Sequence, residues 1–170
     1  YYYPDLPAAY QTTQWFAPVA VNGTVEIETS KGKKAIRIKQ IHMEEDAGKL
    51  VHDDWTDTSL VDFNRTSVPL VEIVTKPIIG AEHRAPEIAK AYIATIRDIV
   101  RGLGISEARM ERGNLRCDAN VSLRPRVAPG EPTPPLGTRT ETKNVNSMRS
   151  VERAVRHEIQ RQAAILAAGG

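Results

Sequence analysis

The sequence predicts an α+β fold, a mostly antiparallel β-sheet with two main flanking helices, and three observations support this prediction. Several short runs alternate apolar and polar residues, as half-buried β-strands do. The first two of these runs are joined by a short turn, which is typical of an antiparallel hairpin. Two longer runs carry apolar residues at spacings of three and four, which is the period of an amphipathic helix.

The composition is that of an ordinary soluble globular protein with one domain. Of its 170 residues, 41% are hydrophobic and 26% are charged, and the formal net charge is +2. The single cysteine excludes an internal disulfide, so a cytoplasmic location is expected. No apolar run reaches the length of about 18 residues that a membrane helix needs, and no membrane association is expected. Because the first residue is not Met, we expect residues 1–170 to be a single incomplete domain.

The beginning of the chain is expected to be extended. Prolines and aromatic residues disfavour a helix in residues 1–23. Residues 25–28 and 36–38 then form the two arms of the hairpin, and Lys31-Gly32 forms its turn.

The segment His42–Lys49 places three consecutive carboxylates beside an imidazole, and their mutual repulsion needs compensation. A bound divalent cation would supply it, because carboxylate oxygens are favoured ligands; the alternative is a solvated acidic turn. A bulge or bend is predicted near Gln40, where the apolar residues change parity. In an extended strand Glu44 and Glu45 point to opposite faces. We expect Glu45 to be the cation ligand, Glu44 to tune the charge and His42 to be structural.

Two further strands are expected at residues 59–65 and 70–74, after a surface loop that extends to Thr58. The second of these strands carries a carboxylate, Glu72, among apolar residues. Such a carboxylate is costly unless it faces a cation, a partner or solvent. Glu72 is therefore either a cation ligand or an outward-facing residue of a half-exposed strand.

The two helices lie in the second half of the chain. The run from Pro86 to Leu103 has the apolar stripe of a core helix, which ends at Gly102 or Gly104. The last helix follows Asn146-Ser147, which can cap its N-terminus. Its apolar stripe is expected to face the core, and arginines occupy its remaining surface.

Between the helices, the turn dipeptide Gly113-Asn114 predicts a hairpin made of residues 107–112 and 115–124. The second arm alternates regularly, so Cys117 is expected to be an inert buried thiol. Asp118 lies on the opposite, polar face, which suits either solvent or a polar ligand.

A proline-rich stretch and a last strand complete the chain. Residues 125–137 contain five prolines and are expected to form an irregular loop. Residues 138–145 are expected to be a strand, and Glu141 is another carboxylate in the middle of a strand.

Common nucleotide-binding and hydrolase motifs are missing from the sequence. Gly48-Lys49 lacks the upstream glycine of a P-loop, and Gly102-Leu103-Gly104 follows a helix rather than a strand. There is also no His-Glu-x-x-His motif. A zinc hydrolase or a dinucleotide-dependent dehydrogenase is therefore not expected.

Six segments, in the family's order, make the chain resemble the GatB/GatE family, the kinase and transamidase subunits of the glutamyl-tRNA/aspartyl-tRNA amidotransferase. They are Tyr3–Pro7, His42–Lys49, Ser59–Arg65, Leu70–Val74, Leu115–Pro125 and Lys143–Ser147. The resemblance implies a cradle of mostly antiparallel sheet with flanking helices, which agrees with the α+β prediction. The family's N-terminal Gly-Leu-Glu-x-His segment and its later helical and tail domains are expected to lie outside this chain.

The resemblance implies an ATP-dependent carbon–nitrogen ligase. ATP would phosphorylate the side-chain carboxylate of mischarged Glu-tRNA(Gln) or Asp-tRNA(Asn), and ammonia would then amidate it to give Gln-tRNA(Gln) or Asn-tRNA(Asn). The ammonia would come from glutamine hydrolysed in an amidase (glutaminase) subunit, and a small third subunit would brace the pair. Bringing ATP and a second anion together requires Mg²⁺ to shield their repulsion.

The resemblance also assigns roles to residues. It implies that Glu45, Glu72 and Glu141 are metal ligands, and that Glu44, Glu45 and Asp118 belong to one catalytic basin. The candidates for phosphate contacts are Lys49, Arg116 and Lys143. The alternative is a non-catalytic RNA-binding or assembly module, in which Arg97–Arg126 and the last helix contact phosphates.

Overall fold

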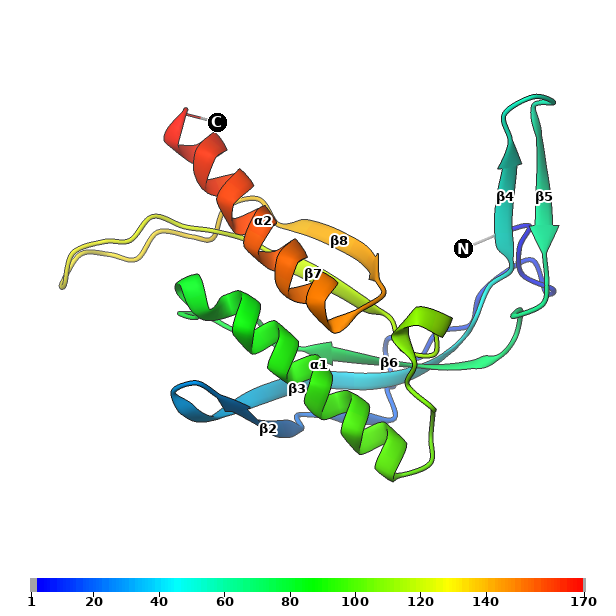
Figure 1. Cartoon of the computed structure of the whole chain (residues 1–170), viewed down its shortest axis with the longest axis horizontal. Helices are drawn as coiled ribbons and strands as arrows, with labels where there is room; N and C mark the ends of the chain where they lie inside the picture. Colours follow the sequence, from blue (N-terminus) through cyan, green and yellow to red (C-terminus); the bar gives the residue numbers. More distant parts are fainter. Residues whose placement is uncertain (1–2, 170) are drawn as a thin grey trace. The chain divides into compact units, whose positions relative to one another are not determined.

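The computed structural model describes residues 3–169 and confirms the predicted α+β class, with antiparallel sheets and two α-helices (Figure 1). The chain divides into two compact units. Unit 1 comprises Tyr1–Val25 and Ala35–Ile78, and unit 2 comprises Glu26–Lys34 and Ile79–Gly170.

The long strand β3 (Gly32–Glu45) is the centre of the main antiparallel sheet. It pairs with β1 (Ala20–Val21), β2 (Thr24–Thr29) and β6 (Pro69–Thr75). The hairpin predicted at the start of the chain is β2–β3. Gly32 has a φ of +92°, a conformation that favours glycine, and this explains why the chain turns there.

The predicted bulge is confirmed by the pairing of β3 with β6, whose register shifts between Ile38 and Gln40. Beyond the shift the pairing is regular, and His42 lies opposite Glu72. The buried face of β3 nevertheless keeps one parity, because Ile36, Ile38, Gln40 and His42 are all buried. Two polar side chains therefore occupy inward positions that continue an apolar row.

The described part of residues 1–23 contains no helix, as predicted, but residues 4–9 form turns instead of an extended chain, and Tyr3 donates its N–H to the carbonyl of Ala9 at 3.0 Å. Side chains attach this N-terminal segment to β3. Gln14 Oε1 accepts a hydrogen bond from the backbone N–H of Met43 at 2.9 Å. Gln11 Nε2 donates to the carbonyl oxygen of Glu45 at 3.0 Å. These two amides take the place of ladder hydrogen bonds beyond the short strand β1.

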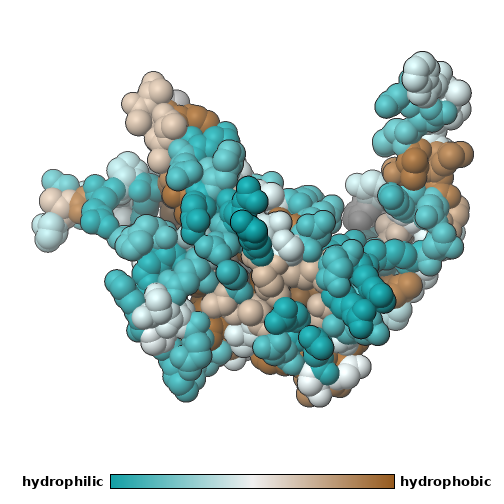
Figure 2. Space-filling view, in the orientation of Figure 1, coloured by the Kyte–Doolittle hydropathy of each residue, from teal (hydrophilic) through white to brown (hydrophobic). Residues whose placement is uncertain are grey.

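The strands β4 (Lys49–Asp53) and β5 (Thr58–Asp62) form a separate two-stranded hairpin. The prediction of a surface loop up to Thr58 was therefore wrong for residues 49–53, which form a strand. Leu50 pairs with Val61, and such apolar cross-strand pairs stabilise a ladder, so only the acidic tip is a turn. Figure 2 shows apolar surface, in brown, on this hairpin, where Leu60 is 66% exposed.

In unit 2, two α-helices and a two-stranded sheet pack together (Figure 1). Besides the end of the β2–β3 hairpin at residues 26–34, its elements are η1 (Glu82–Arg84), α1 (Ala85–Gly102), η2 (Met110–Arg112), β7 (Cys117–Val121), β8 (Thr140–Val145) and α2 (Met148–Ala167). The two α-helices contact each other, and α2 also contacts β7 and β8. The buried apolar side chains of these elements include Ile88, Ile93, Ile96, Val121, Val145, Val151 and Val155.

Both helices begin as the sequence predicts. Pro86 lies in the first turn of α1, where its missing N–H costs nothing, and α1 ends at Gly102. Ser147 caps α2, because its Oγ accepts a hydrogen bond from the N–H of Ser150 at 3.0 Å.

The hairpin predicted around Gly113-Asn114 was wrong, because β7 pairs with β8 instead of with residues 107–112. Gly113 has a φ of +71° and donates its N–H to the carbonyl of Met110 at 2.9 Å. The glycine thus ends η2 as a left-handed cap rather than forming a hairpin turn. Residues 125–137 contain neither helix nor strand, as expected.

Candidate metal centre

A histidine and two carboxylates meet on the inward parity of β3 and its partner β6. His42 Nε2 lies 3.0 Å from Glu44 Oε1 and 2.8 Å from Glu72 Oε2. His42 and Glu44 are two residues apart on one strand, and Glu72 is directly opposite His42 on the other. The ligand atoms of the three residues all lie within 4.8 Å of one another. We call these residues the His42–Glu44–Glu72 cluster.

Exposure rises across the cluster from the protein interior towards solvent. The exposed fraction of the side chain is 1% for His42, 17% for Glu44 and 51% for Glu72. The Nε2–H group of His42 can donate a bifurcated hydrogen bond to both carboxylates. This bond offsets the repulsion between the two carboxylates and holds them close together. The cluster is thus fixed at its buried end and accessible at Glu72.

The donor set fits a divalent cation. It offers one imidazole nitrogen and two carboxylate oxygens from neighbouring strands, a set that suits Mn²⁺ and related ions, while Mg²⁺ would rely on the carboxylates and water. The close approach of the two acids supports this fit, because a cation between them would replace the shared proton.

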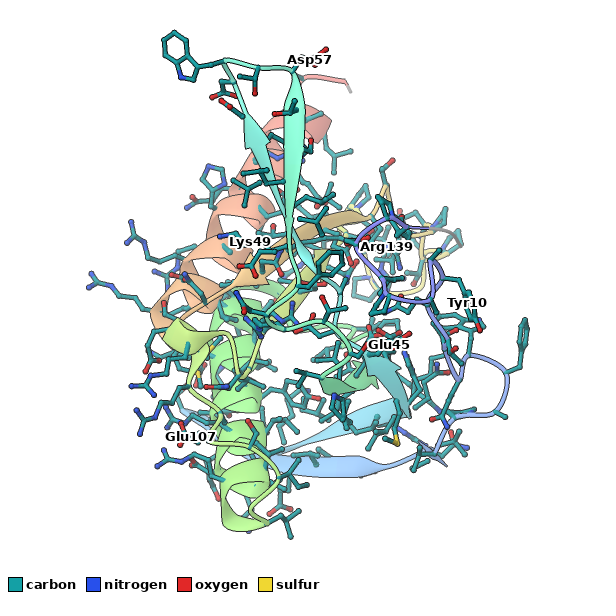
Figure 3. All side chains as sticks on the ribbon, turned by 90° about the vertical axis from the view of Figure 1, so that its right-hand side faces the viewer. Tyr10, Glu45, Lys49, Asp57, Glu107 and Arg139 are labelled. Carbon is teal, nitrogen blue, oxygen red and sulfur yellow. The ribbon has the colours of Figure 1, made fainter. Side chains whose placement is uncertain are left out.

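Glu45, the ligand preferred from the sequence, does not belong to this cluster. It lies opposite Pro69, one residue after Glu44, and successive side chains of a strand point to opposite faces. Figure 3 labels Glu45 at the end of β3, with Lys49 at the base of the β4–β5 hairpin and Asp57 at its tip. Glu45 and Glu72 therefore lie on opposite faces of the β3–β6 pair.

After Glu45 the backbone is tightly held. Asp46 forms an ion pair with Arg65 at 3.3 Å, and its carboxylate also accepts from the N–H of Ala47 at 3.1 Å. Gly48 donates its N–H to the carbonyl of Asp5 at 2.7 Å. Lys49, a candidate for phosphate contacts, is exposed at the start of β4.

The remaining candidates lie in unit 2 and share one exposed face of β7 and β8. Glu141 pairs with Asn120 across the strands, and its carboxylate lies 3.5 Å from Lys143 Nζ. Asp118 accepts a hydrogen bond from the N–H of Asn144 at 2.9 Å. Arg116 precedes β7 and is exposed. The sequence left two roles open for this face, contact with solvent or with a polar ligand, and its exposure agrees with both.

The sequence prediction missed Gln40 and His42 as partners in a buried polar row. Gln40 Nε2 lies 3.4 Å from His42 Nδ1, and both side chains are buried. The signal was present in the sequence, because Gln40, His42 and Glu44 continue the parity of Ile36 and Ile38. Ile41 and Met43, which alternate on the opposite parity, led us to expect the buried face there instead.

A second buried polar group lies where α2 meets the β7–β8 pair. The Glu158 carboxylate accepts hydrogen bonds from Arg161 Nε and Nη2, at 2.8 and 2.7 Å, and from Thr140 Oγ1 at 2.6 Å. Gln162 Nε2 donates to the same carboxylate at 2.9 Å and contacts the carbonyl of Val121 at 3.0 Å. These bonds, those from Arg161 first, hold the pKa of Glu158 well below its usual range.

Cys117 is half-buried, whereas a buried thiol was predicted. Burial raises the pKa of Cys117 to about 11, and the nearby Asp118 contributes in the same direction. A thiol with this pKa is protonated at neutral pH and is a poor nucleophile.

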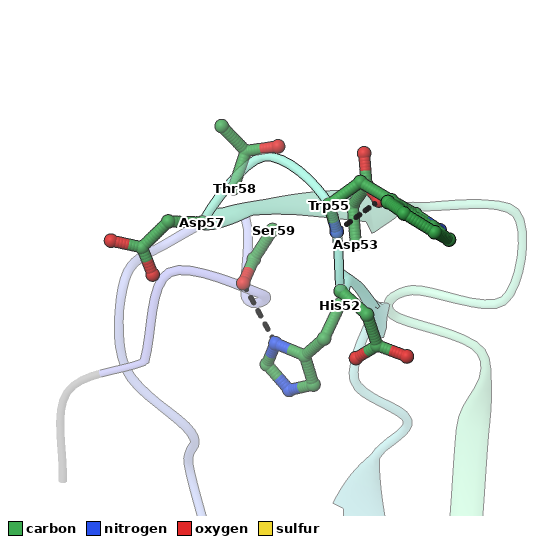
Figure 4. Close-up of a pocket in the computed structure, with 7 residues that line it drawn as sticks. His52, Asp53, Trp55, Asp57, Thr58 and Ser59 are labelled. Carbon is green, nitrogen blue, oxygen red and sulfur yellow. Dashed lines mark hydrogen bonds between the residues drawn. The ribbon is translucent and has the colours of Figure 1, made fainter.

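The tip of the β4–β5 hairpin forms a shallow hollow of about 460 Å³ (Figure 4). His52 Nδ1 and Ser59 Oγ are 2.8 Å apart on one side, and Asp53 accepts from the N–H of Trp55 at 3.0 Å on the other. These contacts shape the turn itself, and Trp55 is 94% exposed. The hollow lies within the hairpin and belongs to its turn geometry.

Across residues 3–169, no helix has the length and apolar content needed to cross a lipid bilayer.

A family model described as the GatB/GatE catalytic domain matches residues 1–168. The B subunit of the aspartyl/glutamyl-tRNA(Asn/Gln) amidotransferase of Clavibacter michiganensis subsp. michiganensis is 62% identical, over 100% of this chain and 35% of that protein. Proteins of the same name from Leifsonia xyli subsp. xyli and Mycobacterium avium are 60% and 53% identical, over 100% of this chain and 35% and 34% of theirs. The chain thus spans about a third of the length of the curated relatives it matches.

Proposed function

Because the chain belongs to the GatB/GatE catalytic domain family, we propose that it is part of a tRNA-dependent amidotransferase subunit. The reaction is the conversion of mischarged Glu-tRNA(Gln) or Asp-tRNA(Asn) to Gln-tRNA(Gln) or Asn-tRNA(Asn). ATP transfers its γ-phosphoryl group to the side-chain carboxylate, and ammonia then displaces phosphate to form the amide. The names of relatives that are 62% and 60% identical over the whole chain support this proposal.

The His42–Glu44–Glu72 cluster is the observation that supports a specific site for the cation in this reaction. ATP and a carboxylate substrate repel each other, and a bound Mg²⁺ would shield that repulsion and orient the transfer. Glu72 is accessible and would meet the cation first, while Glu44 supports it from a more buried position. His42 holds the two acids on one side of the sheet.

The remaining roles are proposals from the resemblance. Glu45, Glu72 and Glu141 are proposed metal ligands, and Asp118 is a proposed further acid of the catalytic basin. Because Glu45 and Glu72 lie on opposite faces of the β3–β6 pair, these two ligands would bind separate cations. For phosphate contacts we propose Lys49, Arg116 and Lys143. The placement of Glu44 beside Glu72 supports adding Glu44 to the ligand candidates.

We propose that both units belong to one catalytic domain, because a single family model covers them. In the assembled enzyme, the proposed partners are an amidase (glutaminase) subunit, which supplies ammonia, and a small third subunit. The proposed location is the cytoplasm.

The charge of the two units favours a role for unit 2 in contacting the tRNA. Unit 2 carries 18 Lys and Arg against 12 Asp and Glu, a formal charge of +6, whereas unit 1 carries 5 against 9, a charge of −4. Basic surfaces attract phosphates. The arginines that the alternative hypothesis assigned to RNA binding would then bind the tRNA substrate of the proposed enzyme.

The test uses the full-length protein in its assembled enzyme. We expect Glu72→Gln and Glu45→Gln each to abolish ATP-dependent phosphorylation of mischarged tRNA, because each removes a charge from the proposed cation ligands. Glutamine hydrolysis by the amidase partner should stay largely intact. The measurement is transfer of ³²P from γ-labelled ATP to Glu-tRNA(Gln).

Glu28→Gln is the matched control, since Glu28 is exposed on β2, and it should leave phosphorylation unchanged. Unchanged phosphorylation in the Glu72 variant would defeat the assignment of the cluster. If only the Glu45 variant is active, the cation site consists of the cluster without Glu45.

A further inference from the structure

We propose that Gln40 is a positioning residue whose buried amide holds the His42 ring so that Nε2 faces Glu44 and Glu72. The inference rests on the proposed function insofar as the cluster is the proposed cation site. It concerns the arrangement of side chains in this chain, which can be measured with or without a cation.

The contact between the amide and the ring is enclosed. Gln40 is 7% exposed and His42 is 1% exposed, and Gln40 Nε2 lies 3.4 Å from His42 Nδ1. The two residues are neighbours on the same face of β3, because the bulge lies before Gln40 and pairing is regular after it. A buried ring nitrogen that lost this partner would be left without a hydrogen bond, which is costly.

The ring is also held from the side. Trp15 packs edge-on against His42, with ring centroids 6.1 Å apart and planes at 72°. Lys39, at the bulge, places its Nζ 5.2 Å from the centroid of Trp15. With the ring plane fixed in this way, the remaining freedom of His42 is a half-turn about its Cβ–Cγ bond.

That half-turn would exchange Nδ1 with Cδ2 and Nε2 with Cε1. A carbon would then face Gln40, and another carbon would face the two carboxylates. The hydrogen bond from Gln40 therefore selects the orientation in which a nitrogen meets Glu44 and Glu72. Gln40 acts on the acids only through His42.

A glutamine suits this position because its amide can either donate or accept. When Nε2–H donates to the carboxylates, Nδ1 is an acceptor and takes a hydrogen bond from the Gln40 NH₂ group. When the Nε2 lone pair faces a cation, the proton lies on Nδ1 and needs an acceptor, which is the Gln40 carbonyl after the amide rotates. An apolar side chain of the same size supports neither state.

The experiment compares Gln40→Met with the parent chain, both carrying Trp55→Phe so that Trp15 is the only tryptophan. Side-chain ¹⁵N NMR of the four histidines, with His42 assigned by its loss in His42→Gln, reports which ring nitrogen is protonated. We expect one tautomer in the parent and a mixture in Gln40→Met. Quenching of Trp15 fluorescence by Mn²⁺ should show affinity reduced about 10-fold or more in Gln40→Met.

Gln11→Met is the matched control, because it removes a glutamine amide that contacts the Glu45 backbone instead of His42. Its histidine spectrum should equal that of the parent. Gln40→Glu keeps the size and an acceptor for Nδ1–H, and should retain the ring orientation in which Nε2 faces Glu44 and Glu72, seen as a single set of His42 ring signals. If Gln40→Met does not fold, this variant decides the question, and two sets of His42 ring signals in it contradict the proposal.

A His42 spectrum and a Mn²⁺ affinity that are both unchanged in Gln40→Met would overturn the positioning role. A parent chain that does not bind Mn²⁺ counts against the proposed cation site instead. In that case the NMR comparison still decides whether Gln40 orients His42, so the two failures are distinguishable.

Discussion

At Gly48 the backbone after the acidic segment passes too close to its neighbours for a side chain. A Cβ placed there would lie 2.9 Å from the carbonyl oxygen of Asp5 and 3.1 Å from that of Asp62. Both contacts are with backbone, which cannot move aside as a flexible side chain can. The glycine therefore allows the N-terminal segment, the acidic segment and β5 to meet at one point.

We expect Gly48→Ala to lower the free energy of unfolding by about 1–3 kcal/mol, because the backbone must shift to accept the methyl group. Urea denaturation followed by circular dichroism measures this. Gly102→Ala is the control, since a Cβ there meets nothing within 4 Å and alanine favours the helix end. Equal effects of the two substitutions would contradict the account of Gly48.

The residue scale also shows where prediction from sequence ends. From the sequence we identified the three-acid run and the isolated Glu72 as candidates for a cation site, and we predicted the bulge near Gln40. The structure brings Glu44 and Glu72 together. Glu45 was preferred because its parity matches the apolar residues Ile41 and Met43. The buried face instead follows Gln40 and His42, since these polar groups satisfy each other there. Hydropathy alone does not reveal such a pairing.

Among the elements, α2 is attached to its sheet by polar contacts as well as by an apolar stripe. Of its apolar stripe, Val151 and Val155 are buried as predicted, but Leu166 is 45% exposed, and the next buried positions are Glu158 and Gln162. A carboxylate in a protein interior is tolerated only when it is paired and hydrogen-bonded. Arg161 and Thr140 supply these partners to Glu158.

Glu158 should make stability depend on pH in the acidic range. Its folded-state pKa lies below the ordinary value of 4.5, so its contribution is present above that pH and is lost as pH falls towards the folded-state pKa. We expect Glu158→Gln to lower the free energy of unfolding at neutral pH. Between about pH 5 and pH 3, the free energy of unfolding should fall less in this variant than in the parent chain. Urea denaturation at several pH values in this range measures the free energy of unfolding of the parent chain and of the variant.

Glu111→Gln, at an exposed residue of η2, serves as the comparison for the loss of one carboxylate. It should keep the acid sensitivity of the parent chain. If Glu158→Gln is as sensitive to acid as the parent, the hydrogen bonds to Glu158 do not hold its pKa down.

The elements predicted correctly are those whose signals are local. The turn at Gly32, the proline at the start of α1 and the cap at Ser147 each act over a few residues. The errors concern pairing over longer distances. Strand β7 pairs with β8 across the irregular loop, and Gly113 has the same preference for positive φ whether it ends a helix or forms a hairpin.

At the scale of the whole molecule, the opposite charges of the two units should govern the proposed binding of tRNA. Arg101 lines a hollow of about 390 Å³ in the positively charged unit 2, together with Ser106, Arg109 and Glu107, and Glu107 forms an ion pair with Arg109 at 3.4 Å. We expect Arg101→Gln to weaken binding of tRNA and to reduce the slope of log affinity against log salt by about one phosphate contact. Fluorescence anisotropy of labelled tRNA over about 50–200 mM salt measures both.

Lys76→Gln removes one positive charge from unit 1 and is the matched control for Arg101→Gln. Its salt slope should equal that of the parent chain. Equal losses in the two variants would mean that total charge, rather than the surface of unit 2, governs the interaction.

The two glutamines that fasten the N-terminal segment have a further consequence for how copies of the chain behave in concentrated solution. Where a strand edge shows free N–H and C=O groups, another molecule can add its own strand, and aggregation follows. Gln11 and Gln14 occupy such groups at Glu45 and Met43. Replacing both with alanine should therefore make the chain self-associate, which light scattering at rising protein concentration would detect. We therefore expect the same two amides that support the acidic segment to limit self-association through this strand edge.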